Sequence, residues 1–228
     1  MKYEKITTGT FLERPNRFVA HVLIGGEMHI CHVKNTGRCK ELLIPGAKVV
    51  LSEGANPSRK TKYDLIAVWK GDMLVNMDSQ APNKVFGEWA MNTPFPENLT
   101  LLRPESTWGK SRFDFYYEAG DEKGYIEVKG VTLERGGVCA FPDAPTTRGA
   151  RHIRELIEVK KAGMGAHLAF VIQMPGMKYL ELNYKTDPDF ARAMEDANRE
   201  GVNIIALECS VTENTLEICG KIPVHLSI

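Results

Sequence analysis

Three charged residues, Asp114, Glu127 and Lys129, have types and a spacing that suit chemistry on a phosphate. The two carboxylates offer the hard oxygen ligands that Mg²⁺ prefers, and Mg²⁺ also accepts phosphate oxygens as ligands. A bound cation would stabilise charge on the phosphate and lower the pKa of a bound water, while Lys129 could orient that water or neutralise the developing anion. The same three residues could also form an ordinary ion cluster on a solvated sheet face, so the pattern leaves both interpretations open.

A β-hairpin is the element that must position these three residues. Residues 112–117 and 125–131 alternate as half-buried strands do, and the segment between them is rich in glycine and charge. A turn centred on the Gly-Asp pair of that segment would place Asp114 opposite Glu127, whereas a slip of two residues would place it opposite Lys129. In either register the charged side chains share one face. We expect the other face to carry the apolar side chains of Phe113, Phe115, Ile126 and Val128.

Length and composition fit one or two compact domains in the cytoplasm. The chain has 228 residues, and its hydrophobic content of 43% suffices for a core. No run of residues is long and apolar enough for a membrane span, and the first residues lack the apolar core of a signal peptide. The five cysteines form no CxxC pair, which favours reduced thiols. A zinc site is disfavoured, because strand alternation separates one member of the candidate cluster His29, Cys31, His32 and Cys39 from the others.

The charge distribution indicates a modest basic surface near the start of the chain. Net charge is zero overall, but residues 1–80 carry 12 Lys and Arg against 8 Asp and Glu, and residues 81–228 carry 17 against 21. A basic cluster of this kind suits phosphate contact, although any solvated loop surface can have the same composition. The residues that we predict to contact nucleic acid in this part are Arg38, Arg59, Lys60 and Lys62.

The pattern of hydrophobic residues divides the chain in two. Residues 1–80 show five or six short strands with turn signals between them, which predicts a small β-barrel with an OB-like fold. Residues 81–228 alternate between helical and strand patterns, which predicts an α/β domain with a mixed sheet. Helices are expected over residues 83–91 and 149–161, and a third helix is expected to open at the Asp-Pro pair of residues 187–188. Small barrels commonly bind oligonucleotides.

Three blocks of sequence resemble the sugar fermentation stimulation protein A family: VKNTGRCKELLIPG, SRFDFYY with YIEVKGVTL, and FPDAPTTRGARHIREL. The resemblance covers nearly the whole chain. It implies an OB-like domain followed by a restriction-endonuclease-like domain of the PD-(D/E)XK type, with nucleic-acid binding as the usual description. By position, Asp114 is the first acidic residue of that motif and Glu127 with Lys129 is its E-x-K, while Glu88 stands where some such nucleases add an acidic ligand. The motif's proline is absent, because Phe113 occupies its place.

The helix after the hairpin and one earlier loop carry further candidates. Thr146 or Thr147 can cap this helix, and in such nucleases it flanks the metal site. Arg148 and His152 could therefore hold a phosphate or orient a water, although a salt-bridged helix surface that includes Arg151 and Glu155 is the alternative. The loop of residues 35–38 is polar and could contact a ligand, or could be a tight turn that needs its glycine.

Together these patterns predict a two-domain cytoplasmic protein without membrane contact. We expect it to bind DNA or RNA and to act as a phosphodiesterase that depends on Mg²⁺ or Mn²⁺. Two alternatives remain: a non-catalytic DNA-binding regulator of sugar-metabolism genes, and a sugar-responsive binding protein, which no residue specifically supports. An intact set of Asp114, Glu127 and Lys129 favours the nuclease, because a purely binding module gains nothing from carboxylates that face a phosphate backbone.

Overall fold

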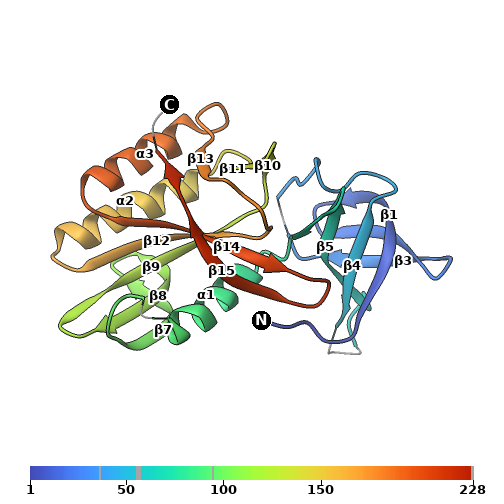
Figure 1. Ribbon diagram of the computed structural model, residues 1–228, viewed down its shortest axis with the longest axis horizontal. Helices are drawn as coiled ribbons and strands as arrows, with labels where there is room; N and C mark the ends of the chain where they lie inside the picture. The colour runs from blue at the N-terminus through green and yellow to red at the C-terminus, as the bar shows by residue number, and fades with distance from the viewer. Residues whose placement is uncertain (36, 55–57, 94, 227–228) are drawn as a thin grey trace.

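The computed structural model describes residues 1–35, 37–54, 58–93 and 95–226, and its first part is a closed barrel (Figure 1). The strands pair in the order β3-β2-β1-β4-β5-β6, and a parallel pairing of β3 with β5 closes five of them into the barrel. The prediction of an OB-like barrel is therefore confirmed. The strands are β1 (Ile6–Asn16), β2 (Val19–Ile24), β3 (Glu27–Val33), β4 (Lys48–Glu53), β5 (Tyr63–Lys70) and β6 (Met73–Asn76).

Strand alternation fills the barrel interior. On β2, for example, Ala20 and Val22 are fully buried, while His21 and Leu23 between and beyond them face outward. Cys31 is likewise buried on β3, and all cysteines of the described residues are free thiols. The apolar side chains of alternate positions thus supply the burial that holds this small barrel together.

The second part is a six-stranded mixed sheet with helices on both faces (Figure 1). Its strand order is β15-β14-β12-β9-β8-β7, with β14, β12 and β9 parallel and the outer strands antiparallel. This confirms the predicted mixed α/β fold. The strands are β7 (Leu99–Trp108), β8 (Ser111–Ala119), β9 (Glu122–Val131), β12 (Gly165–Ile172), β14 (Asn203–Val211) and β15 (Leu216–Ile222). A smaller sheet consists of β10 (Glu134–Arg135), β11 (Val138–Phe141), β13 (Leu180–Leu182) and β16 (Val224–His225).

Three helices cover the large sheet. Helix α1 (Ala81–Asn92) packs Val85 and Phe86 against one face. Helices α2 (Thr147–Lys161) and α3 (Pro188–Arg199) pack on the opposite face. The expected caps are present, because the Thr146 hydroxyl accepts a hydrogen bond from the Gly149 N–H (2.9 Å) and the Asp187 carboxylate accepts one from the Phe190 N–H (2.9 Å). No helix in the described part of the chain is long and apolar enough to cross a membrane.

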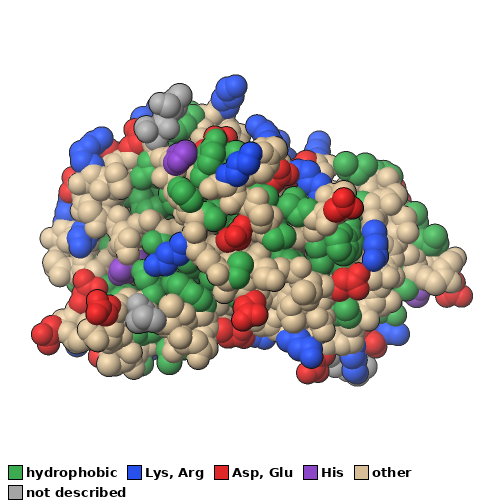
Figure 2. Space-filling view, viewed as in Figure 1, with side chains coloured by type: hydrophobic (Ala, Val, Ile, Leu, Met, Phe, Trp, Pro, Cys, Tyr) green, Lys and Arg blue, Asp and Glu red, His purple; other side chains and the backbone are tan. Residues whose placement is uncertain are grey.

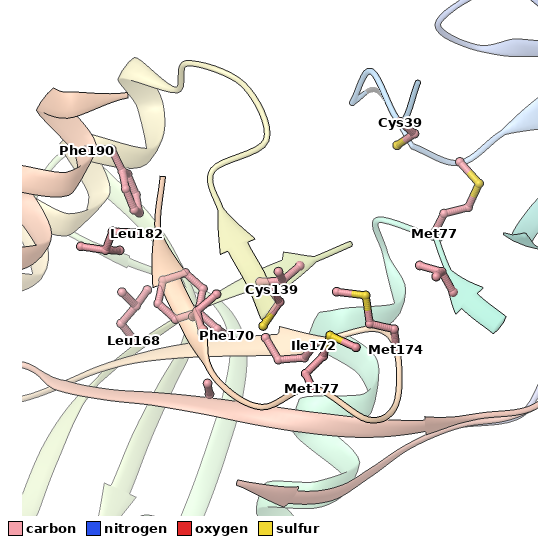
Figure 3. Close-up of a cluster of buried hydrophobic side chains, with 14 of the residues drawn as sticks. Cys39, Met77, Cys139, Leu168, Phe170, Ile172, Met174, Met177, Leu182 and Phe190 are labelled. Carbon is pink, nitrogen blue, oxygen red and sulfur yellow. The ribbon is translucent and has the colours of Figure 1, made fainter. Parts of the chain in front are cut away.

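A shared core fixes the barrel against the sheet. Cys39 and Met77 of the first part belong to the same buried cluster as Cys139, Met174 and Met177 of the second (Figure 3). Hydrogen bonds reinforce this contact, because the buried Gln173 side-chain amide donates to the Asn76 Oδ1 (2.9 Å) and to the Asp78 carbonyl (3.0 Å). The two parts therefore form one continuous packed unit, so residues on both sides of the junction can build one site.

Candidate metal and phosphate site

The β8–β9 hairpin has the register that pairs the two carboxylates. Ala119 lies opposite Glu122, which leaves a two-residue turn in which Gly120 has a φ of 58°. The register continues to Phe115 opposite Ile126, and one further step places Asp114 opposite Glu127. Of the two registers that the sequence allows, the one that opposes Asp114 to Lys129 is therefore wrong.

The regular pairing of β8 with β9 ends just before the two carboxylates. Phe115 packs in the cluster on the α1 side of the sheet, together with Ile126 and Val128, as expected. Phe113 does not follow them, because it packs in the other cluster, where its ring lies 6.2 Å from that of His152. The expectation for Phe113 was wrong, because the strand is irregular at this point. The pairing with β9 has ended, and although β8 stays paired with β7 (Phe113 opposite Ser106), Glu105 of β7 has a φ of 52°, so simple alternation no longer assigns the face. The carboxylates lie where the hairpin opens.

Asp114 is held from two sides at this opening. Its Oδ2 accepts a hydrogen bond from the Val128 backbone N–H (2.7 Å), and its Oδ1 accepts one from the Asn83 amide of α1 (2.7 Å). Burial and the neighbouring charge of Glu127 raise the pKa of Asp114 above its ordinary value, although the hydrogen bonds and Lys129 oppose that rise. The two carboxylates are thus close enough for each charge to act on the other.

Glu127 is almost completely buried, with one oxygen satisfied and one left without a partner. Its Oε1 accepts hydrogen bonds from Lys129 and from His152 Nδ1 (2.6 Å). Burial favours the neutral acid, but the hydrogen bond from His152 and the nearby Lys129 outweigh it and hold the pKa of Glu127 below its ordinary value. Its Oε2 is buried and makes no hydrogen bond to any described residue. An unpartnered buried carboxylate oxygen is unfavourable by itself, and a cation is one natural partner for it.

Helix α2 extends this group of residues outward. His152 is buried at 4% exposure, and Arg148 Nε lies 3.5 Å from its Nε2. Because arginine can only donate, His152 Nε2 accepts and its proton sits on Nδ1, where it is donated to Glu127. Arg148 itself is exposed. Predicted site residues from the hairpin and from α2 thus form one connected series. Arg151 Nε and Glu155 Oε1 instead form an ion pair at 3.6 Å, in which Arg151 is exposed and Glu155 is partly buried.

Glu88 lies on α1 beside a groove, and its carboxylate is not part of the hydrogen-bonded group of Asp114, Glu127 and Lys129 in the described residues. Its carboxylate forms an ion pair with the Met1 amino group (2.7 Å). Glu88 and Asp114 nevertheless line the same groove, which has a volume of about 560 Å³. The groove also contains Glu105, whose φ of 52° is unusual for a residue other than glycine. Acidic side chains therefore border the open side of Asp114.

The predicted basic residues lie on the barrel, in the loops that follow β3 and β4. Arg38, Lys60 and Lys62 are exposed. Arg59 differs, because both its terminal nitrogens donate to Asp64, one at 2.9 Å. Lys62 lies over the Tyr63 ring at 5.1 Å. On the face drawn in Figure 2, basic and acidic side chains are intermixed and do not form a single basic field.

Several residues that the sequence pattern did not single out lie on the barrel beside the predicted basic residues, or contact Asp114. Phe18, in the loop between β1 and β2, is 50% exposed and lies 5.5 Å beneath the Arg17 guanidinium. Arg14 donates four hydrogen bonds to the carbonyls of residues 17, 35, 37 and 38, and so shapes the loop that follows β3. Thr36 of that loop lies outside the described residues. Asn83, which donates to Asp114, lies in the first turn of α1, the helix that precedes the hairpin.

In the part of the chain that the structure describes, only the carboxylates of Asp114 and Glu127 meet at the hairpin opening. Among the described residues no group of three or more His, Cys, Asp and Glu side chains is arranged to hold a metal ion. Asp114 and Glu127 could therefore hold a cation only with help from water, backbone carbonyls or a ligand, which suits Mg²⁺ better than a metal that needs a full set of protein ligands. Lys129 adds a positive charge beside them.

The barrel and the mixed sheet with its paired acidic residues define a protein with an OB domain followed by a nuclease-like domain. Comparison with known families agrees, because residues 12–77 match the SfsA N-terminal OB domain and residues 80–215 match the sugar fermentation stimulation protein RE domain. The chain belongs to the sugar fermentation stimulation protein family, as the resemblance in its sequence predicted.

Relatives match the chain over its whole length. The sugar fermentation stimulation protein homolog of Desulfitobacterium hafniense strain Y51 is 54% identical over 99% of both chains. The homolog of Ruminiclostridium cellulolyticum is 52% identical over 99% of this chain and 100% of the relative. A solved structure, Pyrococcus furiosus SfsA in complex with Ca²⁺, is 28% identical, with a TM-score of 0.89 over 99% of this chain and 98% of the other.

Proposed function

We propose that this protein binds nucleic acid and hydrolyses its phosphodiester bonds with a divalent cation held by Asp114 and Glu127. One observation carries the proposal: Glu127 Oε2 is buried without a partner at the point where the hairpin opens opposite Asp114. The same proposal assigns binding to residues 1–80 and chemistry to residues 81–228. It places the protein in the cytoplasm, in keeping with the free thiols.

The residues present fit a hard divalent cation. Asp114 keeps acceptor capacity on both oxygens after its two hydrogen bonds, and Glu127 keeps Oε2. We expect Mg²⁺ or Mn²⁺ to be the working ion, and the Ca²⁺ complex of the Pyrococcus furiosus relative supports a divalent ion of this class. When bound, such a cation supplies positive charge at the phosphate and acidifies a water. Glu88 is a further candidate ligand, provided that it leaves the Met1 amino group.

The other residues of the site act through charge and position. Lys129, whose ammonium contacts Glu127, is the group that we expect to neutralise charge that develops on the phosphate. His152 fixes the Glu127 carboxylate from behind, because its Nδ1–H donates to Oε1. Arg148, exposed one helical turn away, is placed to contact a phosphate of the bound strand.

The barrel supplies the binding surface in this proposal. In OB folds the loops between the first and second strands and between the fourth and fifth strands commonly contact nucleic acid. The first of these loops carries Arg17 and Phe18, a half-exposed ring on which a base can stack. The second carries Lys60 and Lys62, which are both exposed; the Lys62 ammonium lies 3.8 Å from Glu53 and can exchange this surface ion pair for a phosphate. The loop after β3 adds the exposed Arg38. We assign Arg59 a structural role, because Asp64 already holds it.

A cleavage assay tests the proposal. Labelled single-stranded and double-stranded DNA and RNA are incubated with the protein in Mg²⁺, Mn²⁺, Ca²⁺ or EDTA. We expect products with Mg²⁺ or Mn²⁺, none with EDTA, and none from Asp114→Asn or Glu127→Gln. Glu158→Gln, an exposed carboxylate on α2, is the matched control and should cut as the wild type does. Cleavage that survives in both site variants would refute the proposal.

One observation favours a second function, a DNA-binding regulator without catalysis. Only two carboxylates meet among the described residues, and one of them is already engaged by Lys129. In that case the wild type binds DNA in EDTA and in Mg²⁺ alike, and no cation leads to products. Removing the charge of Asp114 would then strengthen binding, because it deletes repulsion against the phosphate backbone.

A further inference from the structure

A pocket lies at the junction of the barrel and the large sheet, and we call it the junction pocket. Its volume is about 250 Å³. It opens at the carboxyl ends of the parallel strands β9 and β12, a position where open α/β sheets often bind ligands. Five separate segments of the chain line it. Its residues are Asn35, Gly37, Ser79, Gly130, Thr132, Leu133, Ala140, Phe141, Asp143 and Gln173.

The walls of the junction pocket suit a flat, neutral ligand. Leu133, Ala140 and Phe141 form an apolar side, and amides and hydroxyls form the rest. Among the described residues that line it there is no Lys or Arg, and Asp143 is the one charged member. A carboxylate repels a phosphate and accepts hydrogen bonds, so the group that enters the pocket should carry no negative charge and should offer N–H donors. A nucleobase has an apolar face and such donors on its edge.

Asp143 lies at the edge of this pocket and has a free carboxylate among the described residues. Among the described residues its carboxylate makes no hydrogen bond or ion pair. It faces the loop after β3, since a Cβ on Gly37 would lie 3.0 Å from Asp143 Oδ2 and 2.8 Å from Asn35 Oδ1. Arg14 holds that loop in place through the carbonyls of Asn35 and Gly37. The two polar segments therefore meet at the pocket, and Asp143 brings a carboxylate acceptor to its lining.

The junction pocket adjoins the candidate metal and phosphate site. Gly130, on its lining, directly follows Lys129. Gly130 is also two residues beyond Val128, whose N–H donates a hydrogen bond to Asp114. Two residues along a strand span about 7 Å. A Cβ at Gly130 would lie 2.5 Å from Gln173 Oε1 and 2.7 Å from Pro82 Cγ, so only glycine leaves this border intact. A phosphate at the site and a group in the pocket can thus belong to neighbouring parts of one ligand.

We propose that the junction pocket receives one unpaired nucleobase of the strand whose phosphate lies at Asp114, Glu127 and Lys129, with Asp143 accepting a hydrogen bond from the edge of that base. This inference rests on the proposed function and names its substrate class. A paired and stacked base cannot enter such a pocket. The substrates are therefore single strands, overhangs and frayed or mismatched ends, and an intact duplex interior is excluded.

The test uses the full chain and short DNA strands that carry one 2-aminopurine, whose fluorescence rises when the base leaves its stack. Wild type, Asp143→Asn and Thr132→Phe are titrated in Ca²⁺ with a single strand, an overhang and a blunt duplex, and Asp121→Asn in the hairpin turn is the control. Melting curves confirm that each variant folds. Asp143 is exposed, so Asp143→Asn should fold normally. The test therefore remains decisive even if Thr132→Phe, which fills the pocket, does not fold.

We expect the wild type and Asp121→Asn to raise the fluorescence at one position of the single strand and overhang, and not in the blunt duplex. Asp143→Asn should bind these two substrates about tenfold more weakly, and Thr132→Phe should abolish the signal, with duplex binding unchanged in both. Cleavage without any fluorescence change would refute the pocket assignment and leave the proposed function standing. Absence of both nucleic-acid binding and cleavage would refute both. Binding of a free hexose that is lost in Asp143→Asn, with unchanged oligonucleotide affinity, would also overturn the inference.

Discussion

Neutralising the two carboxylates one at a time should change the stability of the metal-free protein in opposite directions. Glu127 is the acceptor for Lys129 and His152, whereas Asp114 is the group whose pKa burial and Glu127 raise. Glu127→Gln therefore removes the negative charge from two charge-assisted hydrogen bonds. Asp114→Asn removes a repulsion, and its amide oxygen can still accept the Val128 N–H while the Asn83 amide turns over.

The expected sizes follow from these contacts. A hydrogen bond to a charged group stabilises by about 1.5–3 kcal/mol and a neutral one by about 0.5–1.5 kcal/mol, so Glu127→Gln loses roughly 2 kcal/mol over two bonds. For a chain of 228 residues this lowers the melting temperature by about 4–8 °C. Asp114→Asn should leave the melting temperature in EDTA unchanged or raise it by about 2 °C, because relief of repulsion offsets the weaker acceptor.

Calorimetric melting in EDTA and then in Mn²⁺ provides the measurement. An ion present at about a hundred times its dissociation constant stabilises the wild type by about 2.7 kcal/mol, and neither variant should show that gain. Asp121→Asn should respond as the wild type does. If Mn²⁺ raises the melting temperature of both variants as much as that of the wild type, Asp114 and Glu127 do not hold the cation. Equal destabilisation by both variants in EDTA would refute the unequal roles argued from their hydrogen bonds.

Three further predictions concern the lysine, the barrel and acid stability. Lys129→Met should keep the Mn²⁺ stabilisation but slow cleavage by about 10²-fold in a single-turnover time course, and unaltered cleavage would exclude a role in charge stabilisation. Replacing Lys60 and Lys62 with Gln should reduce the slope of log affinity against log salt by about two, whereas Phe18→Ala should weaken single-strand binding by about tenfold at an unchanged slope. Burial disfavours the charged Asp64, but hydrogen bonds from Arg59 and His32 outweigh it and lower its pKa, so its stabilising effect is complete above about pH 4 and is lost as pH falls further. Melting curves of the wild type and Asp64→Asn should therefore converge in acid, and a constant difference would contradict this assignment.

The sequence by itself determined the barrel, the mixed sheet and the presence of the hairpin, and it limited the hairpin to two registers. Period-two alternation marks each half-buried strand, and the structure then selects the register whose turn is centred on the Gly-Asp pair. These signals are local, so they can be interpreted without knowledge of the contacts that each segment makes with the rest of the chain. They failed at Phe113, because β8 has lost its pairing with β9 there and the neighbouring strand β7 is irregular at Glu105, so simple alternation no longer assigns a face.

Only the tertiary structure decided which charges are available and where segments meet. The number of basic residues in the sequence predicted that Arg59 belongs to a basic surface, but in the folded protein its guanidinium donates hydrogen bonds to Asp64. Glu127 meets His152 across the gap between a strand and a helix, and no spacing in the sequence encodes that contact. The junction pocket likewise needs the packing of the barrel on the sheet, which brings Gly37 to Asp143. Long-range packing sets burial and partners, and these decide whether a polar side chain is structural or free to bind.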